Sequence, residues 1–190
     1  MRKFIIFFVS FLIILTIIKN ITEKNNIIIK KSKNDNIEYF VRDLENSQDA
    51  AEKLSEINNK LQYLINSLDV KEKDGIDRLK KRYNPNTLVE TEENSKFTSY
   101  SVNKGEKIAL CIREKNEPLT FEKDNTIIFV AIHELAHIMT ESVGHGRDFW
   151  DNMEFLLKKA HQLNIYTPID YKNNTVEYCG MNITSTPYDF

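Results

Sequence analysis

The sequence has no excess of positive charge and very little cysteine. Its 26 lysines and arginines are balanced by 28 acidic residues, which gives a formal net charge of −2. Such a surface does not attract nucleic acid or anionic lipid headgroups, so we expect no nucleic-acid partner. Two cysteines, Cys111 and Cys179, are too few for a disulfide framework. The 190 residues, 41% of them hydrophobic, suffice for one domain with a sizeable core.

The longest hydrophobic run lies near the N-terminus. Residues 4–18, FIIFFVSFLIILTII, follow Arg2 and Lys3 and are apolar apart from one serine and one threonine. As a helix this run spans about 22 Å of a hydrocarbon layer that is about 30 Å thick. No small-residue cleavage site follows it. We therefore predict a transmembrane anchor over residues 1–21, with a secretory signal peptide as the alternative.

The residues that flank this run predict its orientation. Five lysines within residues 19–33 outnumber the two basic residues before the run, and the positive-inside rule then places the C-terminal domain in the cytosol. Sequons at Asn20, Asn173 and Asn182 would matter only in a secretory lumen. A secreted or lumenal form is therefore the alternative, and the oligomeric state is not indicated.

The rest of the chain divides into a polar stretch and a domain that starts at residue 47. Residues 22–46 are polar and mixed in charge, which predicts a linker without a core. Hydrophobic residues then recur every three or four positions, which predicts an amphipathic helix packed on the domain. These residues are Leu54, Ile57, Leu61, Leu64 and Leu68. A shorter helix through Ile76 and Leu79 is expected to end before NPN at residues 84–86.

Strand and helix signals alternate in the second half of the chain. FTSYSV (97–102) and KIALCIR (107–113) are rich in β-forming residues and flank a glycine-containing loop, so we predict a β-hairpin. We expect the strand over residues 107–113 to offer its edge to an extended peptide, with completion of the sheet as the alternative. An almost continuous apolar run over residues 124–142 predicts a buried helix, and residues 146–163 predict an amphipathic helix that packs back on it. The tail is expected to be loop with short extended pieces.

The segment HELAHIMTESVGHGRDFW, residues 133–150, holds three of the four histidines. On a helix, His133 and His137 lie one turn apart on one face, so both imidazoles can bind one ion at about 2.0–2.1 Å. Glu134 is rotated by about 100° from His133, and its carboxylate can reach a water on that ion as a general base. Because buried ionisable groups in an apolar helix need a compensating partner, the pattern predicts zinc binding rather than two incidental histidines.

The third ligand is expected just beyond this helix. His145 follows Gly144, where the chain can turn back over the helix end, and we predict that it completes the site. Glu154 on the following helix is the alternative. Glu141 is less suited, because it lies one turn further along the same helix.

Residues near the C-terminus are expected around this site. Tyr178 is predicted to donate a hydrogen bond to the oxyanion formed during hydrolysis, with core packing as the alternative. Cys179 is expected to be a buried free thiol; a thiolate bound to the zinc and a disulfide with Cys111 are the alternatives. Met181 could form an apolar floor beneath the ion.

These motifs resemble a known group of enzymes. HELAHIMTESVGHGRDFW resembles the active-site segment of WLM-type and SprT-type zinc metallopeptidases, in which HExxH precedes a short turn with the third histidine and then a Phe or Trp. The preceding IALCIREKNEPLTFEKDNTIIFVAIHELAH is similar to the WLM pattern of a strand ending in arginine, a connection and the catalytic helix. Together with TSYSVNKGEKIALCIR and VEYCGMNIT, the segment is similar to uncharacterised metallopeptidase-like proteins of large DNA viruses, over about residues 47–186.

The resemblance implies an α+β fold, a zincin-like domain with a small β-sheet or hairpin and a buried HExxH helix, here preceded by an N-terminal transmembrane helix. It implies His133, His137 and His145 as Zn²⁺ ligands and Glu134 as the base that activates a metal-bound water. We therefore expect a membrane-anchored zinc endopeptidase that acts on a peptide or protein substrate. A catalytically inactive zinc-binding interaction module is the alternative.

Overall fold

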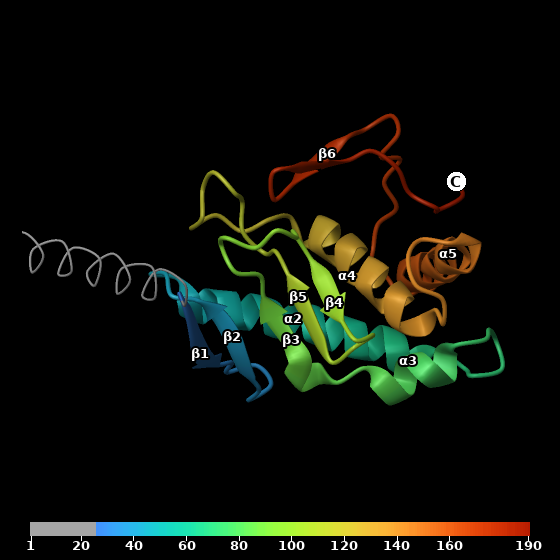
Figure 1. Ribbon diagram of the computed structural model, residues 1–190, viewed down its shortest axis with the longest axis horizontal. Helices are drawn as coiled ribbons and strands as arrows, with labels where there is room; N and C mark the ends of the chain where they lie inside the picture. The colour runs from blue at the N-terminus through green and yellow to red at the C-terminus, as the bar shows by residue number, and fades with distance from the viewer. Residues whose placement is uncertain (1–25) are drawn as a thin grey trace, which may run out of the picture.

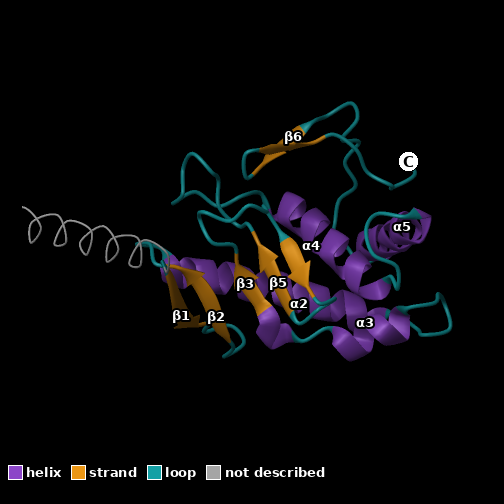
Figure 2. Ribbon diagram, in the orientation of Figure 1, coloured by secondary structure: helices purple, strands orange, loops and turns teal. Residues whose placement is uncertain are grey.

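The computed structural model describes residues 26–190, which form an α+β domain as the sequence predicts (Figure 1). In chain order the elements are β1 (Ile27–Lys31), β2 (Glu38–Arg42), α2 (Ser47–Ser67), α3 (Ile76–Arg82), a 3-10 turn (Pro85–Thr87), β3 (Leu88–Glu90), β4 (Tyr100–Val102), β5 (Lys107–Leu110), α4 (Asp124–Met139), α5 (Arg147–Gln162), β6 (Val176–Tyr178) and β7 (Met181–Ile183). The strands make up three small sheets, and Figure 2 shows the largest, β3–β5–β4, in front of α2, while contacts to α2 and α4 hold it to the helices.

The central sheet has β5 as its middle strand. Ala109 of β5 lies opposite Val89 of β3, which runs parallel to it, and opposite Tyr100 of β4, which runs antiparallel. The predicted hairpin over residues 97–102 and 107–113 is therefore confirmed in a shorter form. The expectation that residues 107–113 offer an edge is wrong, because β5 is hydrogen-bonded on both sides and β4 stands at the edge.

A β-hairpin occupies most of the stretch for which the sequence predicts a linker. β1 and β2 pair antiparallel, and Tyr39 and Val41 of β2 are fully buried in the core. Both strands also contact α2. The linker predicted over residues 22–46 is thus wrong for the hairpin, which belongs to the domain. Two alternating apolar residues in a run rich in Asn, Lys and Asp are too few to reveal a strand period.

Helix α4 forms the centre of the core. Its buried residues lie on nearly every side of the helix, and α2, α3, α5, β4 and β5 all contact it. The helices predicted from residue 47, through Ile76 and over residues 146–163 are confirmed as α2, α3 and α5. The helix predicted over residues 124–142 ends at Met139, because the next residue takes an extended conformation.

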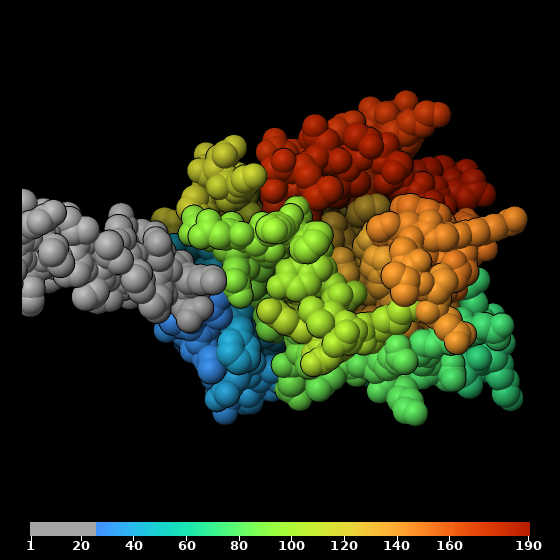
Figure 3. Space-filling model, viewed as in Figure 1, coloured from blue at the N-terminus to red at the C-terminus, as the bar shows by residue number. Residues whose placement is uncertain are grey.

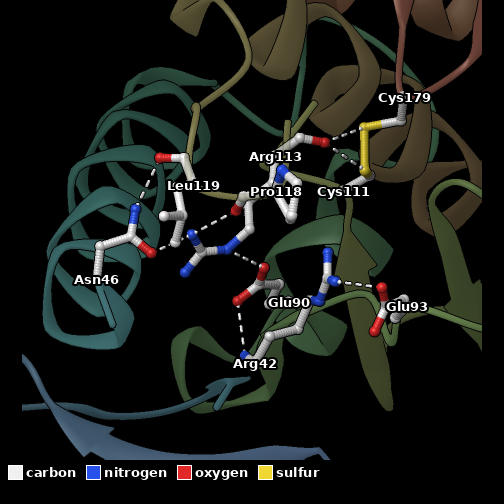
Figure 4. Close-up of polar contacts among 9 residues, drawn as sticks. All are labelled: Arg42, Asn46, Glu90, Glu93, Cys111, Arg113, Pro118, Leu119 and Cys179. Atoms are coloured by element: carbon white, nitrogen blue, oxygen red, sulfur yellow. Dashed lines mark hydrogen bonds and ion pairs between the residues drawn. A yellow bond between two sulfur atoms is a disulfide. The ribbon is translucent and has the colours of Figure 1, made fainter. Parts of the chain in front are cut away.

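A buried arginine fixes the connection between β5 and α4 (Figure 4). Arg113 is 1% exposed, and its Nε donates to Oε1 of Glu90 on β3 over 2.6 Å. Its Nη1 donates to the side chain of Asn46 and to the carbonyl oxygen of Pro118. The backbone N–H of Arg42 donates to the second carboxylate oxygen of Glu90. A buried charge is tolerated when it is paired in this way, so the cluster ties the N-terminal hairpin, β3 and the residues after β5 together.

Cys111 and Cys179 form a disulfide (Figure 4). It joins the residue after β5 to the turn between β6 and β7, and both sulfur atoms lie 3.2–3.3 Å from the carbonyl oxygen of Arg113. The buried free thiol expected for Cys179 is therefore wrong, and the disulfide alternative is what forms. Because the two cysteines are 68 residues apart, their spacing carried no sign that the fold brings them together.

No helix formed by residues 26–190 is both long and apolar enough to cross a membrane. The transmembrane anchor predicted over residues 1–21 lies outside the described residues. The first four residues of the predicted linker lie outside them as well.

Candidate metal centre

Three histidine side chains meet where α4 ends. His133 and His137 come from one face of α4, and His145 comes from the turn between α4 and α5. The Nε2 atom of His145 lies 3.1 Å from the Nε2 atoms of both other histidines. Each ring offers a nitrogen within 4.8 Å of the others. Nitrogens about 2.0–2.1 Å from a tetrahedral zinc ion are about 3.3 Å apart, so this histidine triad has the spacing of ligands to one ion.

The two helical imidazoles are neutral at physiological pH. Burial and then the neighbouring histidine rings lower the pKa of His133 to about 3. Burial, His145 and Lys104 lower the pKa of His137 to about 4. A neutral imidazole keeps the lone pair that a metal ion needs. Both side chains can therefore act as ligands without first losing a proton.

Phe149, at the start of α5, packs against the whole histidine triad. Its buried ring has centroid distances of 4.8 Å to His133, 4.4 Å to His137 and 4.6 Å to His145. An apolar shell of this kind orients the ligand rings and limits access of water. Met181, expected to form the floor of the site, is 50% exposed and lines a neighbouring cavity instead. The sequence placed Phe149 in the segment that resembles a metallopeptidase active site, and it did not indicate the contact of this ring with all three histidines.

Glu134 lies beside the triad and is 4% exposed. Burial raises the pKa of its carboxyl to about 7, although hydrogen bonds with Ser101 act to lower it. Ser101 belongs to β4, so this carboxyl lies between α4 and the edge of the central sheet. A carboxyl group whose pKa is near neutral can both accept and return a proton at pH 7.

A lysine from the β4–β5 turn holds the chain that leads to His145. The ammonium group of Lys104 donates to three successive carbonyl oxygens, those of Thr140, Glu141 and Ser142, over 2.6, 2.6 and 2.7 Å. Thr140 is the C-cap residue of α4, and the other two residues follow it, so the lysine binds the chain just beyond the end of the helix. No sequence pattern pointed to Lys104, because its role depends on a contact between residues that are 36 or more positions apart.

The structure brings His145, and not Glu154, to His133 and His137. Glu154 lies on α5, where its carboxylate pairs with Lys158 over 2.6 Å. It is not part of the group of metal-capable side chains found among residues 26–190. The assignment of all three histidines as ligands stays a prediction that this geometry favours.

Tyr178, predicted to stabilise an oxyanion, lines a cavity that it shares with Glu134. Its side chain is 1% exposed, and burial raises the pKa of the phenol. The hydroxyl donates to the carbonyl oxygen of Cys111 over 2.6 Å and lies 3.0 Å from Oγ of Ser99. The phenol proton of Tyr178 is therefore already engaged in a hydrogen bond within the domain. The catalytic role of Tyr178 stays a prediction.

The chain is similar in sequence and in fold to known proteins. A family model described as the WLM domain matches residues 32–186. An uncharacterised protein of Acanthamoeba polyphaga mimivirus is 34% identical over 159 residues, which cover 80% of each chain. One of Invertebrate iridescent virus 6 is 32% identical over 84 residues, 44% of this chain and 47% of that protein. The crystal structure of Wss1 from Saccharomyces cerevisiae is similar with a TM-score of 0.48 and 23% identity, covering 63% of this chain and 85% of that one.

Proposed function

The chain belongs to the WLM domain family, and from this premise we propose that it is a membrane-anchored zinc endopeptidase acting on a peptide or protein substrate. Membership of the family supports a metallopeptidase-type function in general. The observation that carries the finer proposal is the meeting of three imidazole nitrogens, with separations of 3.1 Å from His145, beside the buried carboxyl of Glu134.

The histidine triad would hold the zinc ion. Neutral imidazoles at this spacing suit a tetrahedral site in which one position stays open. When bound, zinc supplies Lewis-acid chemistry, because it polarises a carbonyl group and acidifies water. Glu134 takes one proton from the attacking water. It then delivers that proton to the amine nitrogen as the carbon–nitrogen bond breaks.

The edge strand β4 is suited to hold the substrate. Its hydrogen-bonded partner in the described sheet is β5, on one side, and Ser101 in this strand bonds with Glu134. An extended peptide that pairs along the open edge would bring a backbone carbonyl group close to the catalytic carboxyl. The peptide-binding edge in this proposal is therefore Tyr100–Val102, in place of residues 107–113.

Tyr178 completes the proposal as a donor to the oxyanion. The phenol lines the cavity next to Glu134. Its hydroxyl would have to turn away from the Cys111 carbonyl group to act on a substrate. Core packing is the competing role for this side chain.

A peptide-library cleavage assay, combined with zinc analysis, tests the proposal. Wild type is expected to carry one zinc ion and to cleave peptides. Glu134→Gln is expected to keep the ion and to lose activity by about 100-fold or more, because it removes a general base. His145→Ala should bind zinc at least about tenfold more weakly. A folded wild type that binds zinc without cleaving would support the non-catalytic module, and one that takes up no zinc would refute both.

The anchor is a separate part of the proposal. It rests on the apolar run over residues 4–18 and the basic residues that flank it. After expression of the full chain, we expect the protein to stay in the membrane pellet during extraction with alkaline carbonate. Release into the supernatant would contradict the anchor and leave the peptidase proposal intact.

A further inference from the structure

A cavity of about 460 Å³ opens beside the metal centre, and His133 and Glu134 form part of its lining. Its walls come from the residues before β4, from α4 and α5, and from the β6–β7 hairpin. Figure 3 shows the surface here as a hollow between the green segment around β4, orange α5 and the red C-terminal segment, with α4 visible inside. Phe129 and Met153 in this apolar cavity are 5% and 1% exposed.

The rim of the apolar cavity carries large hydrophobic side chains that are open to solvent. Phe97, Trp150 and Met181 come from three different parts of the chain, and they are 65%, 39% and 50% exposed. Solvent exposure of several large apolar groups around one opening is typical of a ligand-binding site. Burial of these groups by a ligand would provide binding free energy.

The two sides of the metal centre differ in character. A second cavity also includes His133 and Glu134, but it lies toward the β4–β5 turn and includes Arg82, Asn103 and Lys104. A peptide lying across the metal centre would therefore meet large hydrophobic side chains on one side and the basic side chains Arg82 and Lys104 on the other. Because the two cavities differ, each can favour a different kind of substrate side chain on its side of the scissile bond.

We propose that the apolar cavity binds a large apolar side chain, such as Phe, Leu or Met, adjacent to the scissile bond of the substrate. The inference rests on the proposed peptidase function. Its volume of about 460 Å³ falls within the usual range of ligand pockets, about 300–1,000 Å³. Among Lys, Arg, Asp and Glu, the lining contains Lys96 and Glu134, and Glu134 serves as the base. A charged substrate side chain would thus lose its hydration and find at most one ionic partner, Lys96, for an acidic group.

The position of the apolar cavity along β4 indicates which substrate residue it takes. Antiparallel pairing is slightly the more stable arrangement for added strands, and an antiparallel peptide would run from Val102 toward Tyr100. The apolar cavity lies at residues 96–99, just before β4. It therefore receives the residue on the carboxyl side of the scissile bond.

The wall formed by the β6–β7 hairpin is held in place by three contacts. The Cys111–Cys179 disulfide and the hydrogen bond from Tyr178 to the Cys111 carbonyl group link the hairpin to the end of β5. The backbone N–H of Cys179 also donates to the buried carboxylate of Glu122 over 2.7 Å. A wall that is fixed before binding reduces the entropic cost of enclosing a side chain.

Trp150 allows a binding test that needs no turnover. It is the single tryptophan of the chain, and it lies on the rim of the apolar cavity. Full-length Glu134→Gln protein would be titrated with acetyl-Gly-Phe-amide, acetyl-Gly-Gly-amide and acetyl-Gly-Asp-amide while its fluorescence is recorded. The phenylalanine peptide is expected to bind at least about tenfold more tightly than the other two, because its ring leaves water.

Two substitutions on the Glu134→Gln background separate the cavity from general surface effects. Met181→Asp should abolish the preference for the phenylalanine peptide. Val70→Asp is the matched control, because Val70 is 52% exposed against 50% for Met181 and is not part of the cavity lining. Equal binding of all three peptides, or a preference that survives Met181→Asp, would overturn the proposal.

Cleavage-site mapping with wild type distinguishes this inference from the function on which it rests. Enrichment of Phe, Leu and Met on the carboxyl side of the cleaved bonds is expected. Cleavage without such enrichment refutes the inference and leaves the peptidase proposal standing. Tight binding of the phenylalanine peptide without any cleavage supports the cavity as a binding site and counts against the peptidase.

Discussion

Replacing Lys104 by methionine tests how His145, the proposed third ligand, is positioned. The substitution keeps the apolar stem and removes the ammonium group that donates to three carbonyl oxygens over 2.6–2.7 Å. A hydrogen bond to a charged group contributes about 1.5–3 kcal/mol. The three bonds share one ammonium group, and two of the carbonyls belong to exposed residues, so we count them together as about 1.5 kcal/mol. At about 1.4 kcal/mol per factor of ten, zinc affinity should fall about tenfold.

Competition for zinc with a chelator of known affinity measures this change. Lys107→Met is the matched control, because this lysine is in the same hairpin and its ammonium group contacts the hydroxyl of Tyr100 instead. The circular dichroism of metal-free Lys104→Met should match that of wild type, which shows that the fold is retained. Zinc binding as tight as in wild type would refute the idea that Lys104 positions His145.

Two further predictions concern stability. The Cys111–Cys179 disulfide closes a loop with a sequence separation of 68, so the double serine variant should lose about 4 kcal/mol of unfolding free energy in the chain-entropy model; a loss below about 1 kcal/mol in denaturant titration would contradict this. Burial raises the pKa of Glu52, but hydrogen bonds from the Ser32 hydroxyl and the Lys33 N–H outweigh it and hold the pKa at about 2, below the usual 4.5. This carboxylate therefore stabilises the fold above pH 4.5, and the contribution is lost as the pH falls toward 2. Glu52→Gln should reduce the fall in the free energy of unfolding between pH 4.5 and 2. An unchanged pH dependence would show that Glu52 does not stabilise the N-terminal hairpin through Ser32 and Lys33.

The helices and the core of the candidate site could be predicted because their signals are local. Apolar residues three or four positions apart define α2 and α5, and the same spacing puts His133 and His137 on one face of α4. Gly144 and the compact turn were enough to suggest His145. Each of these features depends on residues that are close in sequence, where helix geometry fixes their relation in space.

The features that could not be predicted depend on contacts between distant segments. Three residues form β3, and they are too few to show a period. The N-terminal hairpin shows only two buried side chains in β2. Two further contacts appear only when the chain is folded. They are the hydrogen bonds of Lys104 with the turn before His145 and the Cys111–Cys179 disulfide. Sequence patterns therefore indicated the three candidate ligands and missed the contacts that hold them and their surroundings in place.

The disulfide would make the proposed substrate selectivity depend on the redox conditions around the domain. Disulfides persist in oxidising compartments and are kept reduced in the cytosol. On the lumenal side of a membrane the β6–β7 hairpin would keep all three contacts with the rest of the domain. On the cytosolic side it would keep the two hydrogen bonds alone, so the proposed peptidase would be less selective there. Cleavage profiles recorded with and without a thiol reductant would reveal this difference directly, and identical profiles would rule it out.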